Sequence, residues 1–361
     1  EHSNRQREGF LARREDYAAD ERVFLRRKLN HPLSLVAHNV GLNEHDDRTN
    51  AKMTKPDRLM NYKRRIPRSI QLAALIVAVV FCANAQQSVR PPASYPPLPD
   101  WISIQRDIHY DRYPATVLDV LQPKQREAAK APAVVVFHGG GWIHSGKETA
   151  YTSLCLPYLE RGFVVFNVEY RVASQATAPA AVTDALDATH WVFEHAQQYN
   201  VDTKRVVITG GSAGGHLALM VGMTPKSARL GPVDPVAAII DGYGITDAVE
   251  LLNGPHHQDW ANQWIPAGPQ CVELARSVSP ITYVRHDLPP IFIVQGADDN
   301  TVPTEQSIRL HDALDMDGVP NEIDVVPNAK HGLSREQWGP ADEKIFAFLK
   351  AHGIEGPVAV Q

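Results

Sequence analysis

Residues 205–219 read RVVITGGSAGGHLAL, and this stretch sets the fold that the chain is expected to adopt. Residues 206–209 form a short apolar run that predicts a buried strand, and the residues from 213 onward predict a helix. Ser212 would then lie on a sharp turn between the two, with its hydroxyl exposed above a sheet. The flanking glycines fit because so tight a turn leaves no space for larger side chains. The pattern G-x-S-x-G alone is weak evidence in a chain with 23 glycines, so its meaning depends on what accompanies it.

Runs rich in Val and Ile alternate with helical patterns along the rest of the chain. Strands are expected at 133–137, 163–168, 206–209, 237–240, 290–294 and 322–326, and helices at 152–161, 180–199, from 213 onward, 304–317 and 341–352. This alternation is typical of the α/β class, with a doubly wound, mostly parallel sheet and helices on both faces. Residues 244–280 break the alternation, and we expect them to form a small cap-like insertion over the mouth of the sheet.

Two later loops carry the groups that a nucleophilic serine needs. Asp298 and Asp299 follow one predicted strand, and His331 follows the next. The carboxyl ends of parallel strands meet at one edge of a sheet, so these side chains are expected beside Ser212. A serine hydroxyl needs a base, and the base needs a carboxylate to orient it. The chain order of serine, acid and histidine is the one expected for this fold class.

A glycine loop at 138–142, HGGGW, follows the first of the predicted strands. Glycines allow backbone N–H groups to approach a developing oxyanion without interference from side chains. The amides of Gly140, Gly141 and Ala213 are the candidate donors. His138 is expected to shape this loop by hydrogen bonding rather than to act as a base.

Together these motifs make residues 107–348 resemble the α/β-hydrolase esterases of the HGGG-bearing, hormone-sensitive-lipase-like group. The resemblance is nearest to the bacterial carboxylesterase, acetyl-xylan esterase and feruloyl esterase-like branch. The matching segments are 138–142, 169–171, 201–202 with Arg205, 210–216, 279–280, 296–303 and 331–332. Many relatives carry Asp before the nucleophile, whereas this chain carries Gly211, which also fits the turn.

The resemblance implies an α/β-hydrolase fold with Ser212, Asp299 and His331 as the catalytic triad. Asp299 is selected over Asp298 by its distance from Pro303 in the family pattern. It further implies hydrolysis of short-chain, acetyl or aryl esters through an acyl-enzyme, without a metal or an organic cofactor. Hydrolysis of amide or peptide bonds, as in arylformamidases and peptidases of the same fold, is the alternative. A hydrolase fold that only binds its ligands is a second alternative.

Several aromatic and histidine side chains admit two interpretations. Trp142, Trp260 and Trp264 would line a substrate pocket or pack in the core. The neighbouring His256 and His257 suggest a metal site together with Asp259, although a flexible insertion is a poor metal cage. His216, just inside the helix after the serine, is expected to pack or cap.

The first hundred residues differ from the body. Residues 1–52 are polar and predict a disordered or upstream extension. Residues 53–85 contain basic residues, an apolar run at 72–83 and a terminal A-x-A, which predict a signal peptide and a secreted or periplasmic protein. A membrane anchor at the same place is the alternative. Residues 86–100 are Pro-rich and predict a linker or surface strap, ahead of a catalytic domain at 101–361.

Charge narrows the choice of partners. The chain has a formal net charge of −5, and the 16 basic and 10 acidic residues of 1–85 leave a net charge of −11 for the remainder. An acidic body argues against nucleic acid as a partner. A small-molecule or polysaccharide-linked ester is the expected partner, with no stable membrane insertion. Cys155 and Cys271 are free to pair in an exported protein, but nothing in their spacing favours a disulfide.

Overall fold

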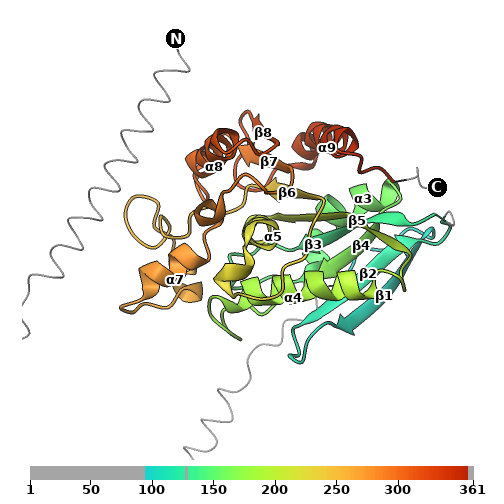
Figure 1. The fold of residues 1–361 in the computed structure, drawn as a ribbon, viewed down its shortest axis with the longest axis horizontal. Helices are drawn as coiled ribbons and strands as arrows, with labels where there is room; N and C mark the ends of the chain where they lie inside the picture. The colour runs from blue at the N-terminus through green and yellow to red at the C-terminus, as the bar shows by residue number, and fades with distance from the viewer. Residues whose placement is uncertain (1–93, 127–128, 357–361) are drawn as a thin grey trace, which may run out of the picture. The chain divides into compact units, whose positions relative to one another are not determined.

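One eight-stranded sheet organises the residues that the computed structural model describes, 94–126 and 129–356 (Figure 1). The strands are β1 (Ile102–His109), β2 (Val117–Pro123), β3 (Ala131–Phe137), β4 (Val164–Val168), β5 (Val201–Gly211), β6 (Ala238–Gly242), β7 (Ile291–Gly296) and β8 (Asn321–Val326). Their order in the sheet is β1-β2-β4-β3-β5-β6-β7-β8. β2 runs antiparallel to both of its neighbours, and all other pairs are parallel. This is the α/β-hydrolase architecture, as expected.

Helices cover both faces of the sheet. The α-helices are α3 (Leu156–Glu160), α4 (Ala180–His195), α5 (Ala213–Met223), α6 (Asp259–Trp264), α7 (Cys271–Ser277), α8 (Thr304–Met316) and α9 (Arg335–Ala351). Short 3₁₀ turns lie at η1 (Lys147–Ala150), η3 (Lys226–Ala228) and η4 (Pro280–Tyr283), and η2 (Tyr151–Cys155) is a π-turn. Apolar residues of α4, α5 and α8 form one core cluster, and those of α3 and α9 form the other.

The side chains of β3 explain why helices must pack on both faces of the sheet. Val135 and Phe137 belong to one cluster, and Val134 and Val136 belong to the other. Side chains alternate between the two faces of a strand, so a strand that is apolar at every position must be buried on both faces. Removal of this apolar surface from water is the main driving force for the fold.

All six predicted strands are confirmed, although some helix boundaries differ. The helix predicted from 341 begins at Arg335, where Ser334 and Gln337 form a capping box. Pro340 lies inside this helix, although proline usually marks a helix start or a break. The helix predicted for 152–161 is divided between η2 and α3.

β1 and β2 were not predicted from the sequence. β1 is an edge strand in which only Ile102 is buried, and it has no continuous apolar run. β2 is buried but interrupted by Asp119, which lies in the interior with hydrogen bonds from Tyr95 Oη (2.6 Å) and the Asp107 N–H (2.7 Å). Lys147 Nζ lies 3.6 Å from the same carboxylate. A buried charge is tolerated when it is paired in this way.

The N-terminal predictions for 1–52 and 53–85 lie outside the described residues. Of the Pro-rich stretch, residues 94–100 are described, and Tyr95 is buried against the sheet. This end of the stretch therefore behaves as a strap rather than as a linker. Within 94–126 and 129–356, no helix is long and apolar enough to cross a membrane.

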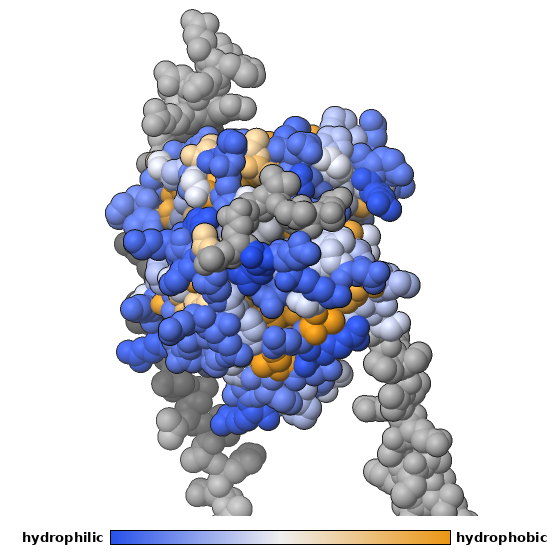
Figure 2. Space-filling model, turned by 90° about the vertical axis from the view of Figure 1, so that its right-hand side faces the viewer, coloured by the Kyte–Doolittle hydropathy of each residue, from blue (hydrophilic) through white to orange (hydrophobic). Residues whose placement is uncertain are grey.

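The segment between β6 and β7 contains α6 and α7 and corresponds to the predicted insertion. Cys155 is buried and Cys271 is half-buried, and neither forms a disulfide within the described part of the chain. Figure 2 shows one face of the molecule, which is largely hydrophilic, with apolar side chains in small separate groups.

Candidate active site

The nucleophile candidate lies on a strained turn between β5 and α5. Ser212 has φ 58° and ψ −122°, a conformation that is uncommon for a residue with a side chain. Its N–H donates to the Gly242 carbonyl at 2.8 Å, which holds the turn against β6. A Cβ on Gly210 would lie 2.3 Å from the backbone of Gly214, and one on Gly214 would lie 2.0 Å from the Phe137 carbonyl oxygen. Both glycines are therefore required by close backbone approach.

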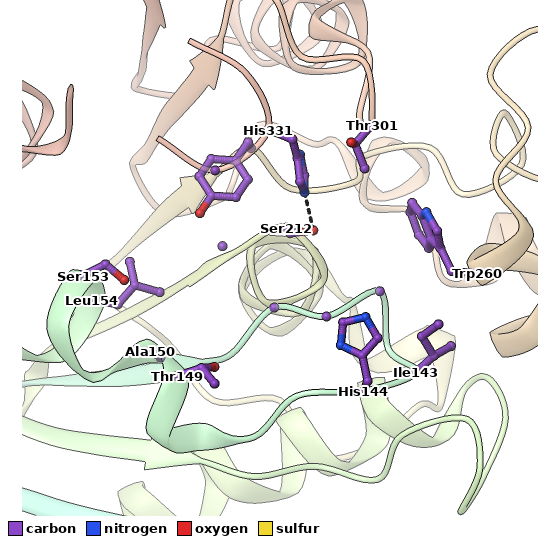
Figure 3. Close-up of a pocket in the computed structure, with 16 residues that line it drawn as sticks. Ile143, His144, Thr149, Ala150, Ser153, Leu154, Ser212, Trp260, Thr301 and His331 are labelled. Carbon is purple, nitrogen blue, oxygen red and sulfur yellow. Dashed lines mark hydrogen bonds between the residues drawn. The ribbon is translucent and has the colours of Figure 1, made fainter. Parts of the chain in front are cut away.

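The structure brings Ser212, His331 and Asp299 together in one hydrogen-bonded chain. His331 Nε2 lies 2.9 Å from Ser212 Oγ (Figure 3). His331 Nδ1 lies 2.8 Å from Asp299 Oδ2. A carboxylate can only accept, so Nδ1 carries the proton, and Nε2 is left to accept from the serine hydroxyl. This tautomer is the one in which an imidazole can act as a general base.

The environment of Asp299 keeps its carboxyl ionised. Oδ1 accepts from the N–H groups of Thr301 (2.8 Å) and Val302 (2.9 Å), and Oδ2 also accepts from Gln295 Nε2 at 3.2 Å. Burial acts to raise the pKa of Asp299, but the hydrogen bonds from His331 and the backbone outweigh it and lower the pKa below its usual value.

Asp298, the other acid that the sequence offered, is exposed to solvent. Its N–H donates to the Ala329 carbonyl at 2.8 Å, so its backbone ties the β7 loop to the β8 loop. Of the two carboxylates, it is that of Asp299 that faces His331.

The glycine loop after β3 passes directly below the serine. Gly140 has φ 113° and Gly141 has φ 59°, and a Cβ on Gly140 would lie 2.2 Å from the His144 carbonyl oxygen. Gly140 and Gly141 line the same cavity as Ser212, and Ala213 follows the serine at the start of α5. The three candidate oxyanion donors are therefore close to Ser212 in the chain or in the cavity.

His138 organises the base of this loop, as expected. Its Nδ1 lies 2.7 Å from the Gly139 carbonyl oxygen. Its ring stacks on Tyr170 at 4.2 Å, and the Tyr170 hydroxyl donates to the His138 carbonyl at 2.8 Å. His138 is fully buried beneath the loop.

A cavity of about 420 Å³ opens above Ser212 and carries several hydroxyl groups. Figure 3 shows two groups of lining residues on opposite sides of the serine. One group comes from η1 and η2: Thr149, Ala150, Ser153 and Leu154. The other group comes from the glycine loop, the insertion and the acid loop: Ile143, His144, Trp260 and Thr301.

The three tryptophans of interest occupy different positions. Trp260 lines the cavity. Trp142 and Trp264 are fully buried and stack on each other behind the wall, with ring centroids 4.1 Å apart. A role in lining the cavity is therefore left for Trp260 alone among these three.

The histidine pair of the insertion does not form a metal-binding group. His256 Nε2 lies 3.6 Å from Glu250, and His257 Nε2 lies 3.7 Å from Asp259, so the two rings face different carboxylates. In the part of the chain that the structure describes, no group of three or more His, Cys, Asp or Glu side chains is arranged to hold a metal ion.

Tyr243 is a cavity residue that the sequence analysis missed. It follows β6 with φ 42°, and its ring packs edge-on against His331 at 5.1 Å. Burial raises the pKa of Tyr243 to about 12, so its hydroxyl stays protonated at neutral pH. The one sequence signal is its place directly after a strand, at the same edge as the other candidates.

Known proteins resemble this chain over the same region. The sequence profile of the BD-FAE family matches residues 118–314. "Probable carboxylic ester hydrolase LipM" of Mycobacterium tuberculosis is 30% identical over 219 residues, covering 58% of this chain and 51% of that protein. The chain spans about half the length of the first curated relatives it matches.

Solved structures extend the likeness. A truncated carbohydrate esterase from gut microbiota is similar with a TM-score of 0.63 and 26% identity, over 70% of this chain and 99% of that chain. A butyrate-bound thermophilic esterase, Est2 of Thermogutta terrifontis, is similar with a TM-score of 0.60 and 26% identity, over 72% of this chain and 96% of that chain.

Proposed function

We propose that this chain, which belongs to the BD-FAE family and has an α/β-hydrolase fold, is a serine carboxylic-ester hydrolase that acts through an acyl-enzyme. The observation that carries the proposal is the continuous contact from Ser212 Oγ through His331 to Asp299, at 2.9 and 2.8 Å. A hydrogen-bonded nucleophile, base and orienting acid at one cavity is the arrangement expected for acyl transfer.

The first half of the reaction begins at the serine. His331 Nε2 takes the proton of Ser212 Oγ as the oxygen attacks the ester carbonyl carbon. Asp299 stabilises the imidazolium that forms and keeps the ring in its productive orientation. Because Asp299 has a lowered pKa, it stays ionised throughout.

Negative charge then develops on the former carbonyl oxygen. The amides of Gly140, Gly141 and Ala213 are the proposed donors to this oxyanion. Loss of one such donor typically costs about 2.7–4 kcal/mol of transition-state stabilisation. Amides in a loop fixed by backbone geometry need little reorganisation when the charge appears.

The second half repeats the proton transfer with water. His331 gives its proton to the departing alcohol oxygen, which leaves an ester between the acyl group and Ser212 Oγ. A water molecule then transfers a proton to His331 and attacks this ester. The acid is released, and Ser212 recovers its proton. No step requires a metal or an organic cofactor.

The substrate is proposed to be a short-chain, acetyl or aryl ester of a small alcohol or of a polysaccharide. The cavity of about 420 Å³ is of the size that takes a small organic ligand. Trp260 supplies one aromatic face, and hydroxyl groups of Thr149, Ser153 and Thr301 line other parts of the wall. One of the similar solved structures is a carbohydrate esterase, and another is an esterase with butyrate bound, which supports this choice.

Replacement of the nucleophile tests the proposal. The Ser212→Ala variant should lose p-nitrophenyl acetate hydrolysis and labelling by a fluorophosphonate, because no oxygen remains to be acylated. Ser227→Ala, at an exposed serine in η3, is the matched control and should behave as the wild type does. Undiminished hydrolysis by Ser212→Ala would refute the assignment.

A substrate panel then separates the bond types. Purified protein should be tested with acetyl, butyryl and hydroxycinnamoyl esters, acetylated sugars, and the matching amides and formamides. Faster turnover of an amide than of its ester would favour the amide-hydrolase alternative. Absence of both labelling and turnover would favour a protein that only binds its ligand.

A further inference from the structure

Trp142, the last residue of the HGGGW segment, is fixed from three sides. Its indole Nε1–H donates to His216 Nδ1 at 3.2 Å. Its carbonyl accepts from the Ala173 N–H at 2.7 Å. Its ring stacks on Trp264 at 4.1 Å, with an interplanar angle of 19°. Trp142 has φ 59° and no exposed surface, so the loop ends in a strained conformation that only its surroundings maintain.

His216 links this tryptophan to the nucleophile. It lies in the first turn of α5, and its N–H donates to the Ser212 carbonyl at 3.0 Å. Its Nε2 lies 2.6 Å from the Val278 carbonyl oxygen. A carbonyl can only accept, so Nε2 carries the proton and Nδ1 is free to accept from Trp142. Burial lowers the pKa of His216 to about 4, so this neutral tautomer persists at neutral pH.

The insertion contributes to the same assembly. Trp264 comes from α6, and Val278 follows α7 directly. Trp260, also from α6, packs over Gly141, where an added Cβ would lie 3.2 Å from the indole ring. The glycine loop, the nucleophile helix and the insertion therefore meet at the Trp142–His216 pair.

We propose that Trp142 and His216 are positioning residues that fix the oxyanion amides of the glycine loop relative to Ser212. This inference rests on the proposed hydrolase function. Neither side chain lines the cavity, so neither would touch the substrate. An oxyanion hole works only if its donors are held near hydrogen-bond distance of the developing charge, and displacements near 1 Å are costly.

The pair would hold that distance because it joins the two elements concerned. Gly140 and Gly141 precede Trp142 directly, and Ser212 and Ala213 lie within one helical turn of His216. The hydrogen bond between the Trp142 and His216 side chains thus connects the glycine loop to α5. The loop carries two of the proposed donors, and the start of α5 carries the third donor next to Ser212. A core contact elsewhere would stabilise the fold, but it would not fix the position of the loop amides relative to Ser212.

The test uses Trp142→Phe, which keeps an aromatic ring against Trp264 but removes the N–H. For a short p-nitrophenyl ester, kcat should fall about 10- to 100-fold while KM changes less than about twofold. Affinity for a boronic acid, which forms a tetrahedral adduct with the serine, should fall by a similar factor. His216→Leu should show the same pattern, and the double variant should be no worse than the poorer single variant.

Thr189→Val is the matched control, because it also removes a buried hydrogen bond, from Thr189 Oγ1 to the Ala185 carbonyl at 2.9 Å in α4. It should lower the thermal midpoint without changing kcat. A folded Trp142→Phe protein with wild-type kcat, or with a change in KM alone, overturns the inference. A wild-type protein without Ser212-dependent hydrolysis is a different result, since it removes the proposed function itself.

Discussion

The Tyr243 hydroxyl lies over Gly211, the residue before the proposed nucleophile Ser212. A Cβ built on Gly211 would be 2.8 Å from Tyr243 Oη and 3.1 Å from Cζ, which is closer than side chains pack. The Tyr243 ring in turn packs against His331 and against Trp338 of α9. The missing side chain at position 211 is therefore matched by an aromatic residue that directly follows the neighbouring strand, β6.

This pairing gives a prediction for the position at which the chain departs from its relatives. Gly211→Asp should lower kcat/KM about 10- to 100-fold, because the carboxylate would push Tyr243 toward His331 and displace the base. The double variant Gly211→Asp/Tyr243→Ala should recover part of the loss. Steady-state kinetics of the three proteins measure this, and a fully active Gly211→Asp would show that Tyr243 yields without moving His331.

A second prediction separates the two adjacent acids. Asp299→Asn should lower kcat by about 10³- to 10⁴-fold, since an amide at this position no longer stabilises the imidazolium and can favour the wrong tautomer. Asp298→Asn is the control of the same chemistry one residue away, and it should keep nearly full activity because Asp298 is exposed to solvent. Equal losses in both variants would contradict the assignment of Asp299.

A third prediction concerns Asp241, a buried carboxyl of β6. Its Oδ1 accepts from the Gly244 N–H at 2.9 Å, while Oδ2 has no hydrogen-bond partner among the residues that the structure describes. Burial raises the pKa of Asp241 from 3.8 to about 7. The folded state thus binds more protons than the unfolded state between these values. The contribution of Asp241 to stability is therefore lost progressively as the pH rises from about 4 to about 7.

Asp241→Asn should remove this dependence. Its free energy of unfolding, relative to that of the wild type, should rise between pH 4 and pH 8 by up to about 4 kcal/mol. Urea unfolding at both pH values measures the difference. Asp317→Asn removes an exposed carboxyl and is the control for the loss of one acidic side chain. A stability difference between Asp241→Asn and the wild type that is the same at both pH values would contradict the raised pKa of Asp241.

The sequence predicted the sheet and the candidate triad because each signal depends on one local pattern. Strands buried on both faces appear as continuous Val and Ile runs, as in β3. Ser212 follows β5, and His331 lies in the loop after β8. Parallel topology alone then brings their loops to one edge. The choice between Asp298 and Asp299 needed the family resemblance, because both residues follow the same strand and their positions alone do not distinguish them.

The remaining features depend on contacts between distant segments. Trp142 and Trp260 are both tryptophans near the glycine loop, yet one is core and the other lines the cavity. The residues next to each tryptophan in the sequence do not indicate which of the two side chains is buried. The role of Tyr243 depends on the absence of a side chain at Gly211, 32 residues earlier in the chain. β1 was missed because an exposed edge strand carries no apolar run.

The burial of Tyr95 has a practical consequence for where the folded body can be cut. A chain shortened to begin at the first strand would lose the hydroxyl that donates to Asp119 and that also accepts from Asn167 Nδ2 at 2.9 Å. Two interior polar groups of β2 and β4 would then lack this partner. A shortened chain that is to keep these hydrogen bonds therefore has to start before Tyr95, inside a stretch that its proline content would mark as dispensable.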